Sequence, residues 1–125
     1  MTERTLAGHT AFVSGSGQNI GRGIAVRLAE LGANVVVNGS RNEAACRETA
    51  ALVEASGAAA LVAMGDVGSR EGCEAVVKPA LERFGRIDVM VHNAALRPSS
   101  PFLEMNEDDW HHILNVNMNA SFWLA

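Results

Sequence analysis

Two spacings of apolar residues alternate along this chain, and together they predict a regular succession of strands and helices. Residues 9–14 form a short apolar run that ends in glycines. Apolar residues then recur every three or four positions up to Gly32, which predicts an amphipathic helix; they are Ile20, Ile24, Ala25, Leu28 and Leu31. Further short apolar runs cover residues 34–37, 58–64 and 87–91. We therefore expect strands that alternate with helices.

Capping residues predict where the later helices begin and end. Residues 42–56 form a helical segment that is closed by Gly57. Ser69 is the predicted N-cap of a further helix, which ends at Gly85. Because a proline lacks the backbone N–H and clashes with the preceding turn, Pro79 is expected to kink or restart that helix.

Asn106 and Asp109 resemble a capping pair, which predicts a last helix that is still running at Ala125. We therefore expect that residues 1–125 form a single, partial domain. Strands that are apolar throughout and alternate with helices are typical of a parallel sheet covered on both faces. The expected fold is a Rossmann-type doubly wound α/β sheet, truncated after the fourth strand and the following helix.

Composition and charge narrow the classes of partner. The chain has 125 residues, of which 48% are hydrophobic, and a formal net charge of −4. These values are typical of a packed globular domain without a basic stripe, which argues against a nucleic-acid partner. The sequence has no apolar run of about 18 residues and no signal-peptide pattern, so we expect no membrane span and a cytoplasmic location.

The cysteines and neighbouring histidines do not indicate a metal site. Cys46 and Cys73 lie far apart in the sequence and form no C-x-x-C pair, so we expect two reduced thiols. His111 and His112 are adjacent, and adjacent residues of a helix point in directions about 100° apart. We interpret them as polar helix positions and expect no metal.

Glycines between the first strand and the first helix predict a phosphate-binding turn. A pyrophosphate needs backbone N–H groups and a helix N-terminus with no side chains in the way. Gly15, Gly17 and Gly21 have the spacing G-x-G-x-x-x-G, which is wider than the usual dinucleotide fingerprint. Glycines that serve only a tight turn and close helix packing are the alternative interpretation.

This stretch resembles the T-G-x-x-x-G-I-G turn of the short-chain dehydrogenase/reductase family. Ser14 stands for the threonine, and Asn19 stands at the middle glycine, where Asn is the non-glycine residue that best tolerates a positive φ. The resemblance implies an NAD(P)-binding Rossmann domain. It also implies that the turn binds the cofactor through Gly15, Ser16, Gly17, Gln18, Asn19, Ile20 and Gly21.

Two further segments agree with this family in their order. Asp66 and Val67 follow the third strand and are similar to the family's adenine-contacting D-V pair; the alternative for Asp66 is a turn former. The segment from His92 through Asn93 and Ala94 to Ala95 stands where the family has N-N-A-G. The resemblance implies that Asn93, Ala94 and Ala95 border the adenine ribose, while His92 and Ala95 depart from the pattern.

Asn117 matches the asparagine of the family's V-N-L segment. The resemblance implies that it is a member of the catalytic tetrad, and the alternative is an ordinary polar helix residue. The family's other catalytic groups are a serine and a Tyr-x-x-x-Lys pair that passes a proton to or from the substrate oxygen. This chain contains no tyrosine, and its single lysine, Lys78, lies in a predicted helix. We therefore expect these residues to be inactive alone.

The end of the second strand indicates which cofactor is preferred. An acid there binds the ribose 2′-hydroxyl of NAD, whereas an arginine accommodates a 2′-phosphate. Gly39 occupies the place where NAD-preferring relatives carry Asp, and Ser40 and Arg41 follow it. We predict NADP(H), with NAD(H) the less favoured cofactor. A solvated Arg41 is the alternative.

The resemblance implies an oxidoreductase that interconverts a small-molecule carbonyl and alcohol by hydride transfer, and that forms a homo-oligomer, a dimer or tetramer, when full length. A non-catalytic dinucleotide-binding module or sensor is the alternative. A methyltransferase is less favoured, because it would need an acid after the second strand to bind the ribose hydroxyls. The loop at residues 96–101 is expected to flank the nicotinamide end of the cleft without specifying a substrate.

Overall fold

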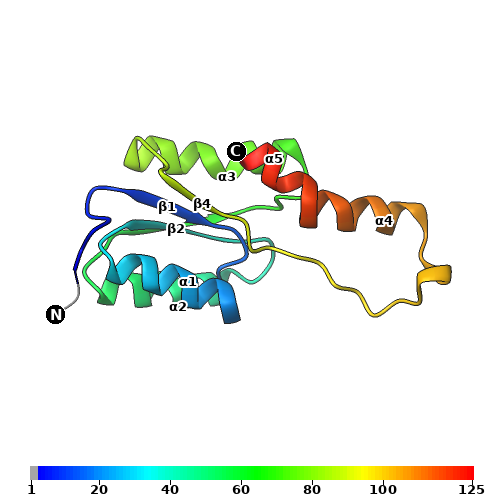
Figure 1. Cartoon of the computed structure of the whole chain (residues 1–125), viewed down its shortest axis with the longest axis horizontal. Coiled ribbons are helices and arrows are strands. Elements are labelled where there is room, and N and C mark those ends of the chain that lie inside the picture. The colour runs from blue at the N-terminus through cyan, green and yellow to red at the C-terminus, as the bar shows by residue number, and fades with distance from the viewer. Residues whose placement is uncertain (1–2) are drawn as a thin grey trace.

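The protein forms a parallel sheet with helices on both of its faces (Figure 1). A computed structural model describes residues 3–125. Its elements are, in chain order, β1 (Thr10–Val13), α1 (Asn19–Glu30), β2 (Asn34–Gly39), α2 (Glu43–Ala55), β3 (Ala60–Met64), α3 (Arg70–Phe84), β4 (Val89–Val91), the 3-10 turn η1 (Phe102–Glu104), α4 (Glu107–Leu114), the π-helical segment η2 (Asn115–Asn119) and α5 (Ala120–Leu124).

The sheet has four strands in the order β3-β2-β1-β4, and all of its pairs are parallel. β1 is central, since Val13 lies in register with Val37 on one side and with Val91 on the other. This order places the ends of β1 and β4 side by side although 78 residues separate Ser14 from His92. The predicted Rossmann-type sheet is confirmed.

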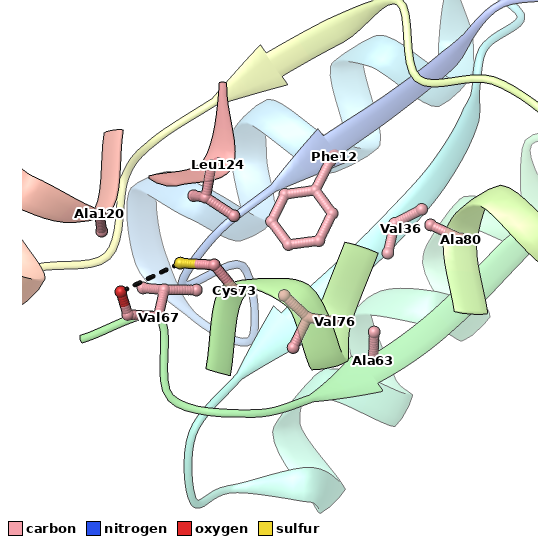
Figure 2. Packing of buried hydrophobic residues seen from close by; sticks show 9 residues of the cluster. All are labelled: Phe12, Val36, Ala63, Val67, Cys73, Val76, Ala80, Ala120 and Leu124. Carbon is pink, nitrogen blue, oxygen red and sulfur yellow. Dashed lines mark hydrogen bonds between the residues drawn. The ribbon is translucent and has the colours of Figure 1, made fainter. Parts of the chain in front are cut away.

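Alternate residues of each strand supply two separate cores. Val35 and Val37 pack with α1 and α2 on one face, and Val36 packs with α3 and α5 on the other. Figure 2 shows the second core, where Phe12 is fully buried. Burial of such a side chain contributes roughly 1.5–3 kcal/mol. The apolar runs are therefore continuous because both faces of the strands are covered.

Short polar side chains cap three of the helices, and the sequence predicts two of these caps, Ser69 and Asn106. The Asn42 side chain accepts a hydrogen bond from Ala45 N at the start of α2, and Ser69 Oγ accepts one from Gly72 N at the start of α3. Asn106 caps α4 by accepting from Asp109 N. These bonds satisfy N–H groups that have no partner within the helix.

Several details differ from the sequence-based expectations, among them β2, which extends to Gly39, and β3, which begins at Ala60 and not at residue 58. The helix α3 runs unbroken through Pro79, so a restart there is wrong; Val76 and Ala80, on either side of the proline, are held in the buried core. The fourth strand begins at Val89 and not at residue 87, because the carboxylate of Asp88 accepts the hydrogen bond of Thr10 N.

The last helical stretch is not one α-helix. It changes to π-helical geometry at Asn115–Asn119 and returns to α-helix at Ala120. Within this segment Asn119 donates a side-chain hydrogen bond to Asn115, and Asn117 turns toward the loop after β4. A π-bulge widens one turn of a helix and commonly occurs at functional sites.

Candidate functional site

A cavity of about 780 Å³ opens where the four strands end. Ligands of open α/β sheets bind at this edge. Residues from each predicted cofactor-binding segment line the cavity: Gly15, Gln18, Asn19, Ile20, Ser40, Arg41, Asp66, Val67, Asn93, Ala94 and Ala95. Gly39, Leu96 and Arg97, from the end of the second strand and the loop expected to flank the cleft, line it too. The lining also includes residues that the sequence did not indicate: Asn38, Gly65, His112 and Val116.

The N-terminus of α1 faces this cavity without a side-chain cap. Gln18 occupies the N-cap position and makes no capping bond, in contrast to Asn42, Ser69 and Asn106. The N–H groups of the first turn are therefore available to a ligand. Together with the positive end of the helix dipole, they form an arrangement suited to an anion.

Glycines let the backbone of the turn pack tightly enough to form this arrangement. Gly15 has a φ of 60°, and a Cβ placed on it would lie 2.8 Å from Ala94 Cα. A Cβ on Gly21 would meet the carbonyl oxygen of Gly15 and would lie 2.7 Å from Asn93 Nδ2. Neither position accepts a larger side chain without displacing backbone.

Asn19 occupies the position of the middle glycine in left-handed geometry. Its φ is 52°, and among residues 3–125 no other residue except glycine has a positive φ. Asparagine is among the few residues that adopt this region readily. The expected tolerance of Asn at this position is confirmed.

Three predicted turn residues do not line the cavity. Ser16 is buried, donates to Val13 O and accepts from Asn38 N, so its side chain fastens the turn to β2. Gly17 and Gly21 pack against neighbouring backbone and side chains. These contacts shape the turn, as the packing interpretation of the glycines expects, and the prediction that the three residues bind the cofactor stays a prediction.

Ser14 joins the glycine turn to the segment after β4. Its Oγ accepts hydrogen bonds from Asn93 N at 2.9 Å and Ala94 N at 3.0 Å and lies 2.9 Å from His92 Nδ1. The side chain of Asn93 in turn donates to Gly15 O. The departure from the family pattern at His92 therefore preserves a hydrogen-bonded contact. Ala95 needs no glycine, because its φ is not positive.

Asn38 is a site residue that the sequence analysis missed. Its side chain is buried at the end of β2, donates to Ala63 O and Gly65 O, and accepts from Gly15 N. It thus connects the ends of three neighbouring strands at the floor of the cavity. The sequence did carry a signal for Asn38, because it is a polar residue near the end of an otherwise apolar strand, and a buried polar side chain needs hydrogen-bond partners.

Asp66 and Val67 line the cavity just beyond β3. The carboxylate oxygen Oδ1 of Asp66 accepts from Gly68 N at 2.8 Å, which is the turn-forming contact of the alternative interpretation. Val67 is buried against Cys73, whose thiol donates to Val67 O (Figure 2). Asp66 therefore both shapes a turn and presents an acid at the cavity.

Asn117 does not line the cavity but binds a loop that does. Its Oδ1 accepts from Leu96 N at 2.7 Å and its Nδ2 donates to Leu96 O at 2.9 Å. Leu96, which makes this contact, and the next residue, Arg97, both line the cavity. The loop then extends away from the sheet toward α4 (Figure 1). Asn117 positions the start of this loop.

A basic rim lies beside the end of β2. Ser40 and Arg41 are exposed there, and Arg97 and His112 line the same cavity from the loop and from α4. His112 was interpreted from the sequence as an ordinary polar helix position, and the structure brings it to the cavity. This placement depends on where the tertiary structure brings α4 relative to the cavity, which no spacing in the sequence indicates.

The two cysteines are free, buried thiols, as expected. Burial is the main cause that raises the pKa of both Cys46 and Cys73 above the ordinary thiol value.

Among residues 3–125 there is no group of three or more His, Cys, Asp or Glu side chains arranged to hold a metal ion. In the same range no helix has the length and apolar character required to cross a bilayer.

A family model described as short chain dehydrogenase matches residues 9–125. The chain belongs to the short chain dehydrogenase family. This match covers the glycine turn, both segments that border the cavity and the π-helical segment with Asn117. The resemblance to this family that the sequence motifs indicate is confirmed.

Several relatives share this half of the fold. The short chain dehydrogenase/reductase astE of Aspergillus oryzae is 46% identical over 116 residues, which is 91% of this chain and 44% of that protein. Glucose 1-dehydrogenase 2 of Bacillus subtilis is 36% identical over 121 residues, 95% of this chain and 46% of that protein. The chain thus spans less than half the length of these relatives.

Solved structures agree with the architecture. A short chain dehydrogenase from Burkholderia cenocepacia, crystallised in complex with NADP, is similar with a TM-score of 0.91 and 30% identity. The similarity covers 96% of this chain and 49% of that one. A short-chain alcohol dehydrogenase structure from Sinorhizobium meliloti has a TM-score of 0.89 and 36% identity, covering 98% of this chain and 48% of that one.

Proposed function

We propose that the protein is an NADP(H)-dependent oxidoreductase that interconverts a carbonyl compound and an alcohol by hydride transfer. The observation that carries this proposal is the cavity at the strand ends. It combines an uncapped helix N-terminus, a tightly packed glycine turn and a basic rim in one space. These features fit the pyrophosphate and the second phosphate of NADP.

In this proposal the chain's own residues bind and orient the dinucleotide. The backbone N–H groups of Asn19 and Ile20 hold the pyrophosphate at the start of α1. The carboxylate of Asp66 and the backbone beside Val67 bind the adenine, and Asn93 with Ala94 borders the adenine ribose. The bound nicotinamide supplies or accepts the hydride.

The preference for NADP(H) is supported by the end of β2. No acid stands at Gly39, so nothing there repels a phosphate, and Ser40 and Arg41 line the cavity immediately after it. A guanidinium binds a phosphate through charge-assisted hydrogen bonds. The NADP complex of the Burkholderia cenocepacia relative agrees with this choice.

Asn117 is proposed to serve the reaction as a positioning residue. Its two hydrogen bonds hold Leu96 where the loop enters the cavity wall. The Tyr-x-x-x-Lys pair of the family is not among these 125 residues, because they include no tyrosine. Proton transfer to the substrate oxygen is therefore not assigned to any residue of this chain.

We also propose a homo-oligomer and a cytoplasmic location. Exposed apolar side chains gather on α4, the π-helical segment and α5, including Trp110, Met118 and Phe122. Such a surface is typical of a protein interface. Free thiols at Cys46 and Cys73 suit a reducing compartment.

Titration calorimetry of the complete natural protein with NADPH and NADH tests the cofactor assignment. We expect tighter binding of NADPH, and we expect Arg41→Ala to reduce the NADPH-to-NADH affinity ratio by about tenfold or more, the value of one charge-assisted hydrogen bond. Arg47→Ala is the matched control, since Arg47 lies on α2 in an exposed pair with Glu43. An unchanged ratio in Arg41→Ala would contradict the preference.

Turnover tests the reaction itself. Consumption of NADPH with a panel of ketones and aldehydes is expected for at least one member of the panel. Tight dinucleotide binding without turnover of any carbonyl compound or alcohol would favour the non-catalytic binding module instead.

A further inference from the structure

A thiol from α2 fills the space beside the last residue of β2. Cys46 is 1% exposed, and its Sγ lies 2.6 Å from the position that a Cβ on Gly39 would take. Carbon and sulfur atoms do not approach so closely without displacement. A side chain at position 39 therefore cannot be accommodated while Cys46 keeps its place.

Among residues 3–125, the thiol is the only close obstacle to a Cβ at this position. The next nearest atom to that Cβ position is Met64 Cε at 3.7 Å, an ordinary van der Waals distance. The backbone sets no limit either, because Gly39 is not among the glycines of residues 3–125 that have a positive φ. An L-residue fits the strand geometry there.

The same thiol also borders the glycine turn. A Cβ on Gly17 would lie 3.1 Å from Cys46 Sγ and 3.5 Å from Ala45 Cβ. Cys46 thus fills the space beside two glycines, one in the turn after β1 and one at the end of β2. Since burial raises the pKa of the Cys46 thiol, it remains a neutral, apolar filler at neutral pH.

We propose that Cys46 is a specificity-determining residue of the cofactor site. Its thiol keeps position 39 without a side chain, and so excludes the acid that would bind the ribose 2′-hydroxyl of NAD(H). Cofactor choice is then a property of the pair Gly39 and Cys46, and not of position 39 alone. This inference rests on the proposed function, because it concerns the same dinucleotide site.

Four versions of the complete natural protein test the pair: the unmodified protein, Gly39→Asp, Cys46→Ala and the double variant. Their affinities for NADH and NADPH are measured by titration calorimetry. We expect Gly39→Asp alone to gain no affinity for NADH. In the double variant the atom nearest to the new Cβ is Met64 Cε at 3.7 Å, and we expect about a tenfold gain in NADH affinity, the value of a charge-assisted hydrogen bond.

Thermal unfolding without cofactor gives a second, independent measurement. Gly39→Ala adds only the Cβ, and we expect it to lower the melting temperature by roughly 2–8 °C through overpacking. Adding Cys46→Ala should remove that loss. Gly17→Ala should cost less than Gly39→Ala, because its contact distance is longer. Gly23→Ala is the matched control, since nothing lies within 4 Å of its Cβ position and Cys46→Ala should leave its effect unchanged.

The outcomes separate this inference from the proposed function. Equal NADH affinity in Gly39→Asp and in the double variant overturns the role of Cys46. If Gly39→Asp does not fold, rescue of Gly39→Ala by Cys46→Ala supports the steric pair, and absence of rescue overturns it. If the unmodified protein binds neither dinucleotide, the proposed function fails, while the melting temperatures still decide the packing relation.

Discussion

The hydroxyl of Ser14 lies 2.9 Å from Nδ1 of His92, and this contact determines the tautomer of the histidine ring. Both lone pairs of the hydroxyl are occupied by the N–H groups of Asn93 and Ala94, so its hydrogen is donated to Nδ1. The ring proton is therefore on Nε2, which donates to Val116 O at 2.8 Å. His92 thus connects the glycine turn to the π-helical segment.

Replacing this histidine tests the connection. We expect His92→Leu to destabilise the protein by roughly 1–3 kcal/mol, because Ser14 and the Val116 carbonyl both lose a partner. His92→Asn should cost less, since an amide oxygen can still accept from Ser14. Urea unfolding measures both free energies, and nitrogen chemical shifts of the ring report which nitrogen carries the proton. A proton on Nδ1 would contradict the assignment.

The left-handed backbone at Asn19 leads to a second prediction. Asn19→Gly should leave the free energy of unfolding almost unchanged, because glycine adopts a φ of 52° without strain. Asn19→Val should cost about 1–2 kcal/mol, because a β-branched residue is strained in that region. Urea unfolding compares the two variants. Equal stabilities would show that the turn adjusts its backbone.

Arg22 anchors the glycine turn to α2, and we expect its contribution to stability to come mainly from hydrogen bonds to uncharged groups. Its guanidinium donates to Gly17 O at 2.7 Å, to Ala45 O at 3.1 Å and to Thr49 Oγ1 at 2.9 Å. We expect Arg22→Ala to cost about 2–3 kcal/mol in the free energy of unfolding, because two backbone carbonyls and a buried hydroxyl lose a partner.

Two controls distinguish these bonds from the ion pair that Arg22 makes with Glu48. Glu48→Gln should cost less than about 1 kcal/mol, because Glu48 is 70% exposed in the pair. Arg27→Ala removes an exposed arginine of the same helix, paired with Glu30, and should have a similarly small effect. Equal losses in Arg22→Ala and Glu48→Gln would assign the stability to the ion pair.

Asp88 makes stability depend on acid pH. The hydrogen bonds from the Arg86 guanidinium and then from Thr10 N lower the pKa of this carboxyl below its ordinary value. The unfolded chain, whose Asp titrates near pH 3.9, then binds more protons in this range than the folded one. The stabilisation is fully present above about pH 4 and is lost as the pH falls through the folded pKa.

Melting temperatures measured across acid pH test this effect. Asp88→Asn should flatten the acid loss of stability, because an amide accepts from Thr10 N without titrating. Glu54→Gln is the control, as it removes an exposed carboxylate on α2. If the melting temperature of Asp88→Asn fell with pH as steeply as that of the unmodified protein, Asp88 would not be the source of the acid dependence.

Asn117 is expected to order the loop after β4. Its Oδ1 accepts from Leu96 N at 2.7 Å, so Asn117→Ala should make the Leu96 amide proton exchange faster, by about tenfold for the loss of one net hydrogen bond. Asn115→Ala is the control in the same π-helical segment, since Asn115 bonds to Asn119 and not to the loop. Unchanged exchange in Asn117→Ala would show that the loop is held elsewhere.

The sequence by itself determined the order of the elements, two of the helix caps and the place of the phosphate turn. These features depend on spacing within about a dozen residues. Apolar runs define strands, recurrence every three or four residues defines helices, and short polar residues cap helix starts. Ser69 and Asn106 were predicted for this reason, and the family motifs indicated much of the cavity lining.

Only the tertiary structure decided how the residues of each motif are used. Ser16 is turned into the interior, Asn38 connects three strand ends, and His112 reaches the cavity from α4. Cys46 fills the space that a side chain at Gly39 would need. Each relation joins parts of the chain that meet only when strands pair and helices pack. Periodicity reports which face of an element is buried, but the contacts across that face depend on its neighbours.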